Sequence, residues 1–321
     1  MKMRWLLALM LGVVTAFFVS VMAGKSFIAP SQWFEGGTTG LILWELRLPR
    51  ALLGASIGAV LGLSGAVLQG YLRNPLADPT VVGVSSSAAL GGVIALFFGG
   101  AALPLIVFLS AMAGALMSIL LLIALGGRAG GPLGFILAGM VLSTLAGSLT
   151  AFLISIAPNP YATSEIVTWL MGALTDRGWP DVAVGLPFMI CGGLILLTTG
   201  RALDGLILGH DTALSLGINP AQLRWTIAIG IGLSVGASVA VTGVVGFVGL
   251  IVPHVVRPWV GQRPSATLIP SALAGALLLL TADSVVRVLP GVAEVRLGVV
   301  MAVLGTPFFF HLLRQIKARA L

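Results

Sequence analysis

The ionisable residues most able to do chemistry lie near the ends of apolar segments. Asp283 and Arg287 are four residues apart in one apolar stretch, and Glu294 and Arg296 flank the start of the next. A charge at the centre of a bilayer costs about 2.5–3.5 kcal/mol on insertion scales, so such residues usually pair or mark a function. The spacing of Asp283 and Arg287 predicts an ion pair on one helix face.

The sequence offers no catalytic or metal-binding constellation. The histidines are scattered, without cysteine or carboxylate partners at ligand spacing, so we expect no metal ion at His210, His254 or His311. An intramembrane enzyme would need a paired nucleophile and base, which we do not find. Gly24-Lys25-Ser26 resembles the end of a phosphate-binding loop, but Val19 stands where that loop needs a glycine. We therefore expect no cofactor and no nucleotide site, and the single cysteine, Cys191, excludes an internal disulfide.

The composition is that of a membrane protein. Of the 321 residues, 58% are hydrophobic and 8% are charged, which is more apolar surface than a soluble chain of this length can bury. A helix needs about 20 apolar residues to cross a bilayer. The sequence predicts ten spans, with the third and eighth short or interrupted: 5–23, 48–71, 86–102, 104–125, 133–154, 182–200, 225–245, 247–260, 268–289 and 295–316. We expect an all-α polytopic membrane protein with one domain, 1–321, whose first apolar run is a retained helix rather than a signal peptide because of its length.

The basic residues predict how the chain is oriented. With both termini inside, eleven of the 17 Lys and Arg residues fall at inner ends of the spans and six at outer ends. This bias follows the positive-inside rule and places both termini in the cytoplasm. The net charge of +7 is therefore explained by orientation, and we expect no nucleic-acid partner.

An internal repeat links two parts of the chain. The stretch from Gly58 to Pro75 recurs as Gly236 to Pro253, with six identical positions and a proline at the end of each copy. The copies lie five predicted spans apart, an odd number, so they cross the bilayer in opposite directions. Inverted repeats with interrupted helices are typical of transporters. The repeat halves are expected at about 47–160 and 225–316.

Two polar segments stand out between the spans. The segment Asn74-Pro75-Leu76-Ala77-Asp78-Pro79 holds two prolines that cannot both lie inside one regular helix, and Asn74 and Asp78 can cap the broken ends. It is either an ordinary interhelical turn or an interrupted helix that lines a pathway. His254 directly follows Pro253, the proline that ends the second copy of the repeat. It either lines the pathway or packs in the interior with its hydrogen bonds made.

The second polar segment, residues 201–224, is the longest on the inner side. Its apolar residues alternate with charged ones, Gly209 and Gly217 interrupt it, and Asn219-Pro220 can begin another helix. This pattern predicts two short amphipathic helices that project into the cytoplasm. Such helices either rest on lipid or bind a protein, and the small number of cationic residues favours a protein.

Secondary carriers and ATP-driven transporters differ in their energy source. An ion-coupled secondary carrier would work alone, but the chain lacks the buried series of carboxylates that proton-coupled carriers use. An external ATPase that binds residues 201–224 is the alternative, and the sequence favours it.

Taken together, these motifs resemble the permease family of type II ABC importers for iron siderophores, haem and vitamin B12. The resemblance covers nearly the whole chain. It rests on RLPR (47–50), SGAVLQGYLRNPLADPTVVGVSSSAALG (64–91), WLMGAL (169–174), the LxxLxLGxxxAxxLG pattern (203–217), GxVGFVGLIVPHxxR (243–257) and GVVMAVLGTPFF (298–309). It implies a homodimer with the pathway at its interface, two cytoplasmic ABC ATPase subunits and a periplasmic or lipid-anchored substrate-binding protein, in a bacterial inner membrane.

The resemblance also implies roles for particular residues. Arg47, Arg50 and Arg287 would dock the binding protein. The coupling helices, at about 206–223, would contact the ATPase through Leu206, Leu208, Gly209, His210, Asp211, Ala213, Leu216, Gly217, Asn219 and Pro220. The gate and pathway would include Gly131, Pro132, Leu133, Asn74, Pro75, Pro253 and His254. The gate segment of relatives carries hydroxyl residues, which Gly130-Gly131-Pro132-Leu133 lacks.

The cargo is expected to be an iron chelate, a siderophore or haem. Where relatives have Glu-Leu-Pro or Glu-Ile-Pro before the last helix, this chain has Glu294-Val295-Arg296. The extra positive charge near the outer mouth favours an anionic chelate. Cobalamin is the alternative cargo, because its permeases share the same motifs.

Overall fold

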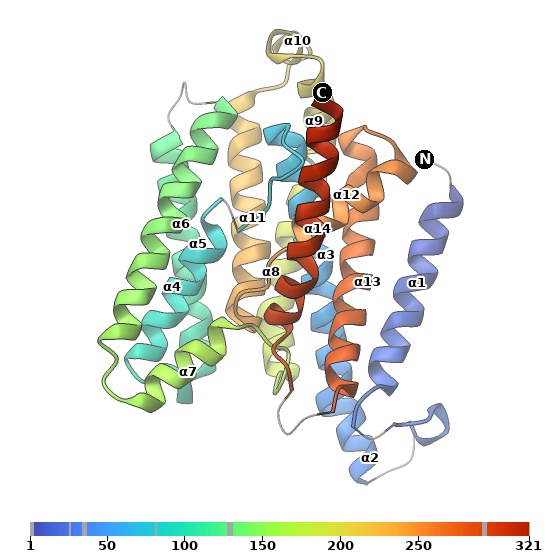
Figure 1. Ribbon diagram of the computed structural model, residues 1–321, viewed down its shortest axis with the longest axis vertical. Helices are drawn as coiled ribbons and strands as arrows, with labels where there is room; N and C mark the ends of the chain where they lie inside the picture. Colours follow the sequence, from blue (N-terminus) through green and yellow to red (C-terminus); the bar gives the residue numbers. More distant parts are fainter. Residues whose placement is uncertain are drawn as a thin grey trace.

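The computed structural model describes residues 3–25, 27–33, 37–80, 82–126, 131–290 and 294–320. All regular structure in these ranges is helical (Figure 1). Seven long apolar stretches are able to cross a membrane, and three shorter apolar helices accompany them. The long helices are α1 (Met3–Met22), α3 (Leu48–Leu72), α5 (Pro104–Gly126), α6 (Gly131–Ser155), α8 (Trp179–Leu197), α11 (Pro220–Thr242) and α13 (Pro264–Val288). The apolar stretch of α3 begins at Thr38 and includes two short helices before it, and that of α8 continues to Ile207.

The three shorter apolar helices complete the set of ten predicted spans. They are α4 (Val84–Phe97), α12 (Val248–Val260) and α14 (Leu297–Ala320), the last of which is apolar as far as Leu312. The third and eighth spans are therefore short, as the sequence predicts. The chain is a multi-pass, all-α membrane protein.

Short helices lie at the two ends of the bundle. They are η1 (Pro30–Gln32), α2 (Thr38–Leu41), the π-helical η2 (Ile42–Arg47), η3 (Gly100–Ala102), α7 (Pro160–Leu170), α9 (Gly200–Ile207) and α10 (His210–Ser215). The start of α1, the end of α14, α9 and α10 share one end, which we call the inner end, and α2 and α7 lie at the opposite, outer end (Figure 1). The sequence did not predict α7. Its N-cap is Asn159, whose side chain accepts from the backbone N–H of Ala162.

The repeated segments run in opposite directions, but their helices are interrupted at different places. Helix α3 runs from the outer end to the inner end, and α11 runs away from the inner end (Figure 1). Helix α3 ends where Arg73 adopts a left-handed conformation, just before Pro75. Helix α11 ends at Gly243, whose φ of 76° suits a residue without a Cβ. Pro253 lies inside α12 and does not break that helix. The repeat had suggested an interrupted helix at this proline, and that expectation is wrong.

Small residues bring α3 and α13 into contact. A Cβ added to Gly58 would overlap the backbone carbonyl of Gly275, and one added to Gly62 would overlap the carbonyl of Ser271. Lipid offers no hydrophobic drive for helix association, so backbones that approach this closely are a main source of packing energy. Gly58 and Gly62 thus form a helix-packing face on α3.

Candidate functional site

The α9–α10 segment projects beyond the inner end of the bundle. Figure 1 shows α10 farther from the bundle than any other helix at this end. Gly209, with φ of 111°, separates α9 from α10, and Gly217, with φ of 76°, ends the turn after α10. The Asn219 side chain then accepts from the N–H groups of Ala221 and Gln222 and caps α11, whose first residue is Pro220. The prediction of two short helices and a new helix start is confirmed.

The projecting segment is anchored by one set of apolar residues and exposes another. Leu203, Leu206 and Ala213 are buried against the bundle. In contrast, Leu208 and Leu216 are 63% and 60% exposed. Leu214 is also exposed, and so is Asp211. We call the exposed residues Ile207, Leu208, Leu214 and Leu216 the apolar patch. Exposed apolar residues gathered beside polar ones mark a surface that binds another molecule.

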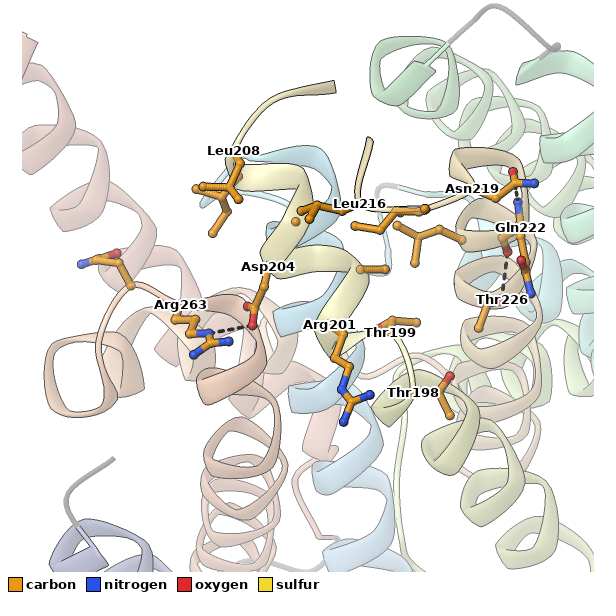
Figure 2. Close-up of a pocket in the computed structure, with 17 residues that line it drawn as sticks. Thr198, Thr199, Arg201, Asp204, Leu208, Leu216, Asn219, Gln222, Thr226 and Arg263 are labelled. Atoms are coloured by element: carbon orange, nitrogen blue, oxygen red, sulfur yellow. Dashed lines mark hydrogen bonds and ion pairs between the residues drawn. The ribbon is translucent and has the colours of Figure 1, made fainter. Parts of the chain in front are cut away.

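A cavity of about 870 Å³ lies beneath this patch, between α9, the turn at 216–219 and the start of α11. Figure 2 shows Leu208 and Leu216 at its rim. Asp204 binds Arg263 at 2.7 Å on one side of it. The same carboxylate accepts from the Ser265 N–H at 2.9 Å and from the Ser265 hydroxyl at 2.6 Å. Asp204 therefore ties α9 to the first turn of α13, a link that the sequence did not reveal.

A buried polar junction joins the two repeats. Pro253 has no N–H, so it cannot bond the carbonyl of Gly249 four residues earlier. The Gln69 amide of α3 donates to that carbonyl instead, at 3.1 Å. The Arg257 Nη2 in turn donates to the Gln69 Oε1 at 2.7 Å. The proline thus creates a binding point for the other repeat rather than a break.

The segment between α3 and α4 forms turns that support this junction. Asn74 Oδ1 accepts from the Leu76 N–H, and Asp78 Oδ1 accepts from the Thr80 N–H, both at 2.9 Å. Contrary to the expectation from the sequence, neither side chain caps α3 or α4, because Arg73 and Gly83 stand at those helix ends. Asp78 is buried and packs against Gly249 in the first turn of α12, a helix of the other repeat.

The predicted gate residues are only partly brought together. Pro75 and His254 line a second cavity at the inner end, of about 750 Å³. The His254 ring packs edge-on against Phe308, with centroids 5.7 Å apart. Asn74 and Pro253 flank these residues in the chain but do not line the cavity. Gly131 and Pro132 begin α6, and Leu133 is 67% exposed and lies outside the cavity.

The three predicted docking arginines lie at the outer end, and all are buried. Arg47, Arg50 and Arg287 are 7%, 9% and 4% exposed. Arg50 binds Asp283 with Nε at 3.1 Å and Nη2 at 2.8 Å, and its Nη2 also lies 2.8 Å from the Glu294 Oε2. Arg287 lies 3.1 Å from the other Asp283 oxygen, so the predicted pair is confirmed.

Backbone carbonyls at the end of α1 and directly after it accept from two arginines of this cluster. Arg47 Nη1 donates to the Met22 carbonyl at 2.7 Å, and Arg287 Nη1 donates to the Ala23 carbonyl at 3.2 Å. Burial alone would raise the pKa of the Glu294 carboxyl, but the hydrogen bond and charge of Arg50, aided by the Thr175 hydroxyl, hold this pKa below its ordinary value. Glu294 therefore stays ionised and paired at neutral pH.

Comparisons with known proteins identify the class. The all-helical architecture is that of an ABC importer permease. The family model of the FecCD transport family matches residues 11–315, and the chain belongs to this family. The solved structure of a metal-chelate type ABC transporter in an inward-facing conformation superposes with a TM-score of 0.89 at 33% identity, covering 97% of this chain and 99% of the other.

The names of curated relatives are more specific than the family, because they state a cargo. The cobalamin import permease BtuC of Halobacterium salinarum is 38% identical over 92% of this chain and 79% of its own. The vitamin B12 permeases BtuC of Serratia proteamaculans and Salmonella typhi are each 37% identical, over 98% and 97% of this chain and 94% and 95% of theirs.

Proposed function

We propose that this chain is the membrane subunit of an ATP-driven importer of cobalamin. The observation that carries the transport part is the α9–α10 segment, which exposes an apolar patch at the inner end and is tied by Asp204 to α13. An ATPase that binds the patch would move α9, and with it α13. The chain would act as a homodimer with two ATPase subunits, in the inner membrane and with both termini in the cytoplasm.

The cargo is proposed from the relatives. Several curated relatives at 37–38% identity are named as cobalamin or vitamin B12 permeases, which favours the alternative over the iron chelate expected from the sequence. The structural relative described as a metal-chelate transporter keeps an iron chelate as the second candidate.

An uptake competition separates the two cargoes. In cells that carry this chain with its ATPase and binding protein, we expect accumulation of radiolabelled cobalamin that excess unlabelled ferric siderophore does not reduce. Uptake of the ferric siderophore with no uptake of cobalamin would overturn the cargo assignment and leave the transport role intact.

Docking of a substrate-binding protein is proposed to proceed by exchange of partners at Arg50. Its guanidinium is occupied by Asp283 and Glu294, and Glu294 is the more accessible of the two, with a side chain 23% exposed against 2%. A glutamate of the docking protein would displace Glu294 and take its place. Such charge pairs set orientation and association rate more than affinity.

Glu294→Gln tests this exchange. A neutral amide binds a guanidinium less tightly than a carboxylate does, by about 1 kcal/mol, so docking is expected to become about fivefold tighter. Asp181→Asn is the matched control, because Asp181 pairs with Arg177 and does not touch Arg50. The measurement is binding-protein affinity for nanodisc-embedded chain; unchanged or weaker binding in Glu294→Gln would contradict the exchange.

A further inference from the structure

The second cavity at the inner end is lined by cationic and apolar residues. It lies between α3, α12, α13 and α14 and has a volume of about 750 Å³. Arg73, Arg257 and His254 contribute to its wall, and none of its described lining residues is acidic. Ala66, Pro75, Val255, Pro258 and Leu312 form an apolar part of the wall. The cavity therefore combines cationic donors with a surface that suits hydrocarbon.

The two arginines in this cavity bond only neutral acceptors among the described residues. Arg257 donates to the Gln69 Oε1 at 2.7 Å, and Arg73 donates to the Leu206 carbonyl. The described ion pairs involve other arginines: Arg50, Arg177, Arg263 and Arg287. A guanidinium has five N–H donors, so Arg73 and Arg257 retain donors for an anion. Phosphate is the anion that such donors match best in geometry.

Aromatic residues indicate how deep in the membrane the cavity lies. Trp259, two residues after Arg257, stacks on Trp5 at the start of α1, with ring centroids 5.3 Å apart and planes 11° apart. Tryptophan is enriched where the bilayer meets water, at the level of the lipid headgroups. The cavity mouth therefore lies at the depth of lipid phosphates.

We propose that this cavity binds a phosphate group through Arg73 and Arg257. The group comes from an anionic lipid of the inner leaflet or from free phosphate, which share the same chemistry. Basic pockets between transmembrane helices on the cytoplasmic side are known to hold anionic headgroups. Since Arg73 also holds the Leu206 carbonyl at the end of α9, an occupant would contact the same side chain as the projecting segment. The proposal does not depend on the cargo.

Gln262→Glu is the sharpest test, because it adds a negative charge to the cavity without changing side-chain size. Gln262 is exposed in the loop after α12 and lines both inner cavities. Gln222→Glu is the matched control, because Gln222 lines only the cavity beneath the apolar patch. Native mass spectrometry of the purified full chain measures how much added phosphatidylglycerol or phosphatidylcholine is retained.

We expect the wild-type chain and Gln222→Glu to prefer phosphatidylglycerol, and Gln262→Glu to bind it about fivefold less well, the factor expected for one charge near a membrane surface. Arg73→Gln with Arg257→Gln should lower retention further, and Gln262→Glu keeps the test valid if that double variant does not fold. A preference for phosphatidylglycerol that is equally strong in Gln262→Glu and wild type would overturn the proposal. So would no preference over phosphatidylcholine together with no effect of phosphate.

A thermal melt with inorganic phosphate distinguishes the two sources. Stabilisation of the wild-type chain but not of Gln262→Glu by millimolar phosphate, with no lipid preference, would support the anion site and assign it to free phosphate. Lipid preference without an effect of phosphate would support it and assign it to the headgroup.

Discussion

Replacing Leu208 and Leu216 together with glutamate is expected to abolish ATP-driven uptake and to release the ATPase from the permease. Both side chains are mostly exposed at the projecting end, while neighbouring Leu206 is buried and anchors the segment. Burying one leucine contributes about 1.5–3 kcal/mol. Loss of two such contacts, with two charges added, should weaken ATPase binding by at least about 100-fold. Co-purification of the ATPase and its affinity measure the effect.

The control for this variant lies at the other end of the molecule. Leu41 of α2 is 63% exposed, and Figure 1 places α2 at the outer end. Leu41→Glu should leave ATPase binding unchanged. If the Leu208 and Leu216 variant folds and still binds the ATPase with wild-type affinity, the projecting segment is not the contact surface.

Gly58→Ala is expected to destabilise the bundle strongly, although it adds only one methyl group. The new Cβ would overlap the Gly275 carbonyl and lie 2.9 Å from the Ala276 Cα, both of them backbone atoms of α13. No side-chain rotation relieves such an overlap, so α3 and α13 must separate. Overpacking of a tight core costs about 1–3 kcal/mol, and here it also opens the packing beside it. We expect a markedly lower melting temperature.

Gly147→Ala is the matched control. Gly147 lies within α6, and a Cβ there would meet nothing within 4 Å. Alanine is the better helix former by about 1 kcal/mol, so this variant should be neutral or slightly stabilised. Equal melting temperatures for the Gly58→Ala variant and the wild-type chain would show that the α3–α13 contact does not stabilise the bundle.

Local patterns in the sequence predicted the parts of the fold that depend on local physics. Long apolar runs predicted the spans, because a span must satisfy its own backbone in lipid. Glycines at 209 and 217 and the Asn219-Pro220 pair predicted the projecting segment, because each requires a particular backbone conformation. The Asp283–Arg287 pair followed from helical spacing alone.

Contacts between distant residues were not predictable in this way. Gln69 and Gly249 are 180 residues apart, and nothing in either neighbourhood indicates that one completes the hydrogen bonding of the other. The same holds for Asp204 and Ser265. The burial of Arg47, Arg50 and Arg287 likewise depends on the tertiary packing of α1, α3 and α13. The positions of these arginines near span ends therefore predicted at which end of the molecule they lie. They did not predict that the side chains are buried.

Helix α13 connects the projecting segment at the inner end to the arginine cluster at the outer end. At its first turn Ser265 bonds Asp204 of α9, and near its last turn Asp283 bonds Arg50 of α3. The close glycine contacts between α3 and α13 lie between these points. A displacement of the projecting segment would therefore be transmitted along a stiff helix pair to the outer end.

Under the proposed function, the chain conducts its cargo only when a separate ATPase acts on the projecting segment. Proteoliposomes that contain the purified chain, with binding protein and cargo on the outer side, measure this dependence. We expect no accumulation under a proton or sodium gradient alone, and accumulation once the ATPase and ATP are added. Gradient-driven accumulation by the chain without any ATPase would show instead that it is a secondary carrier.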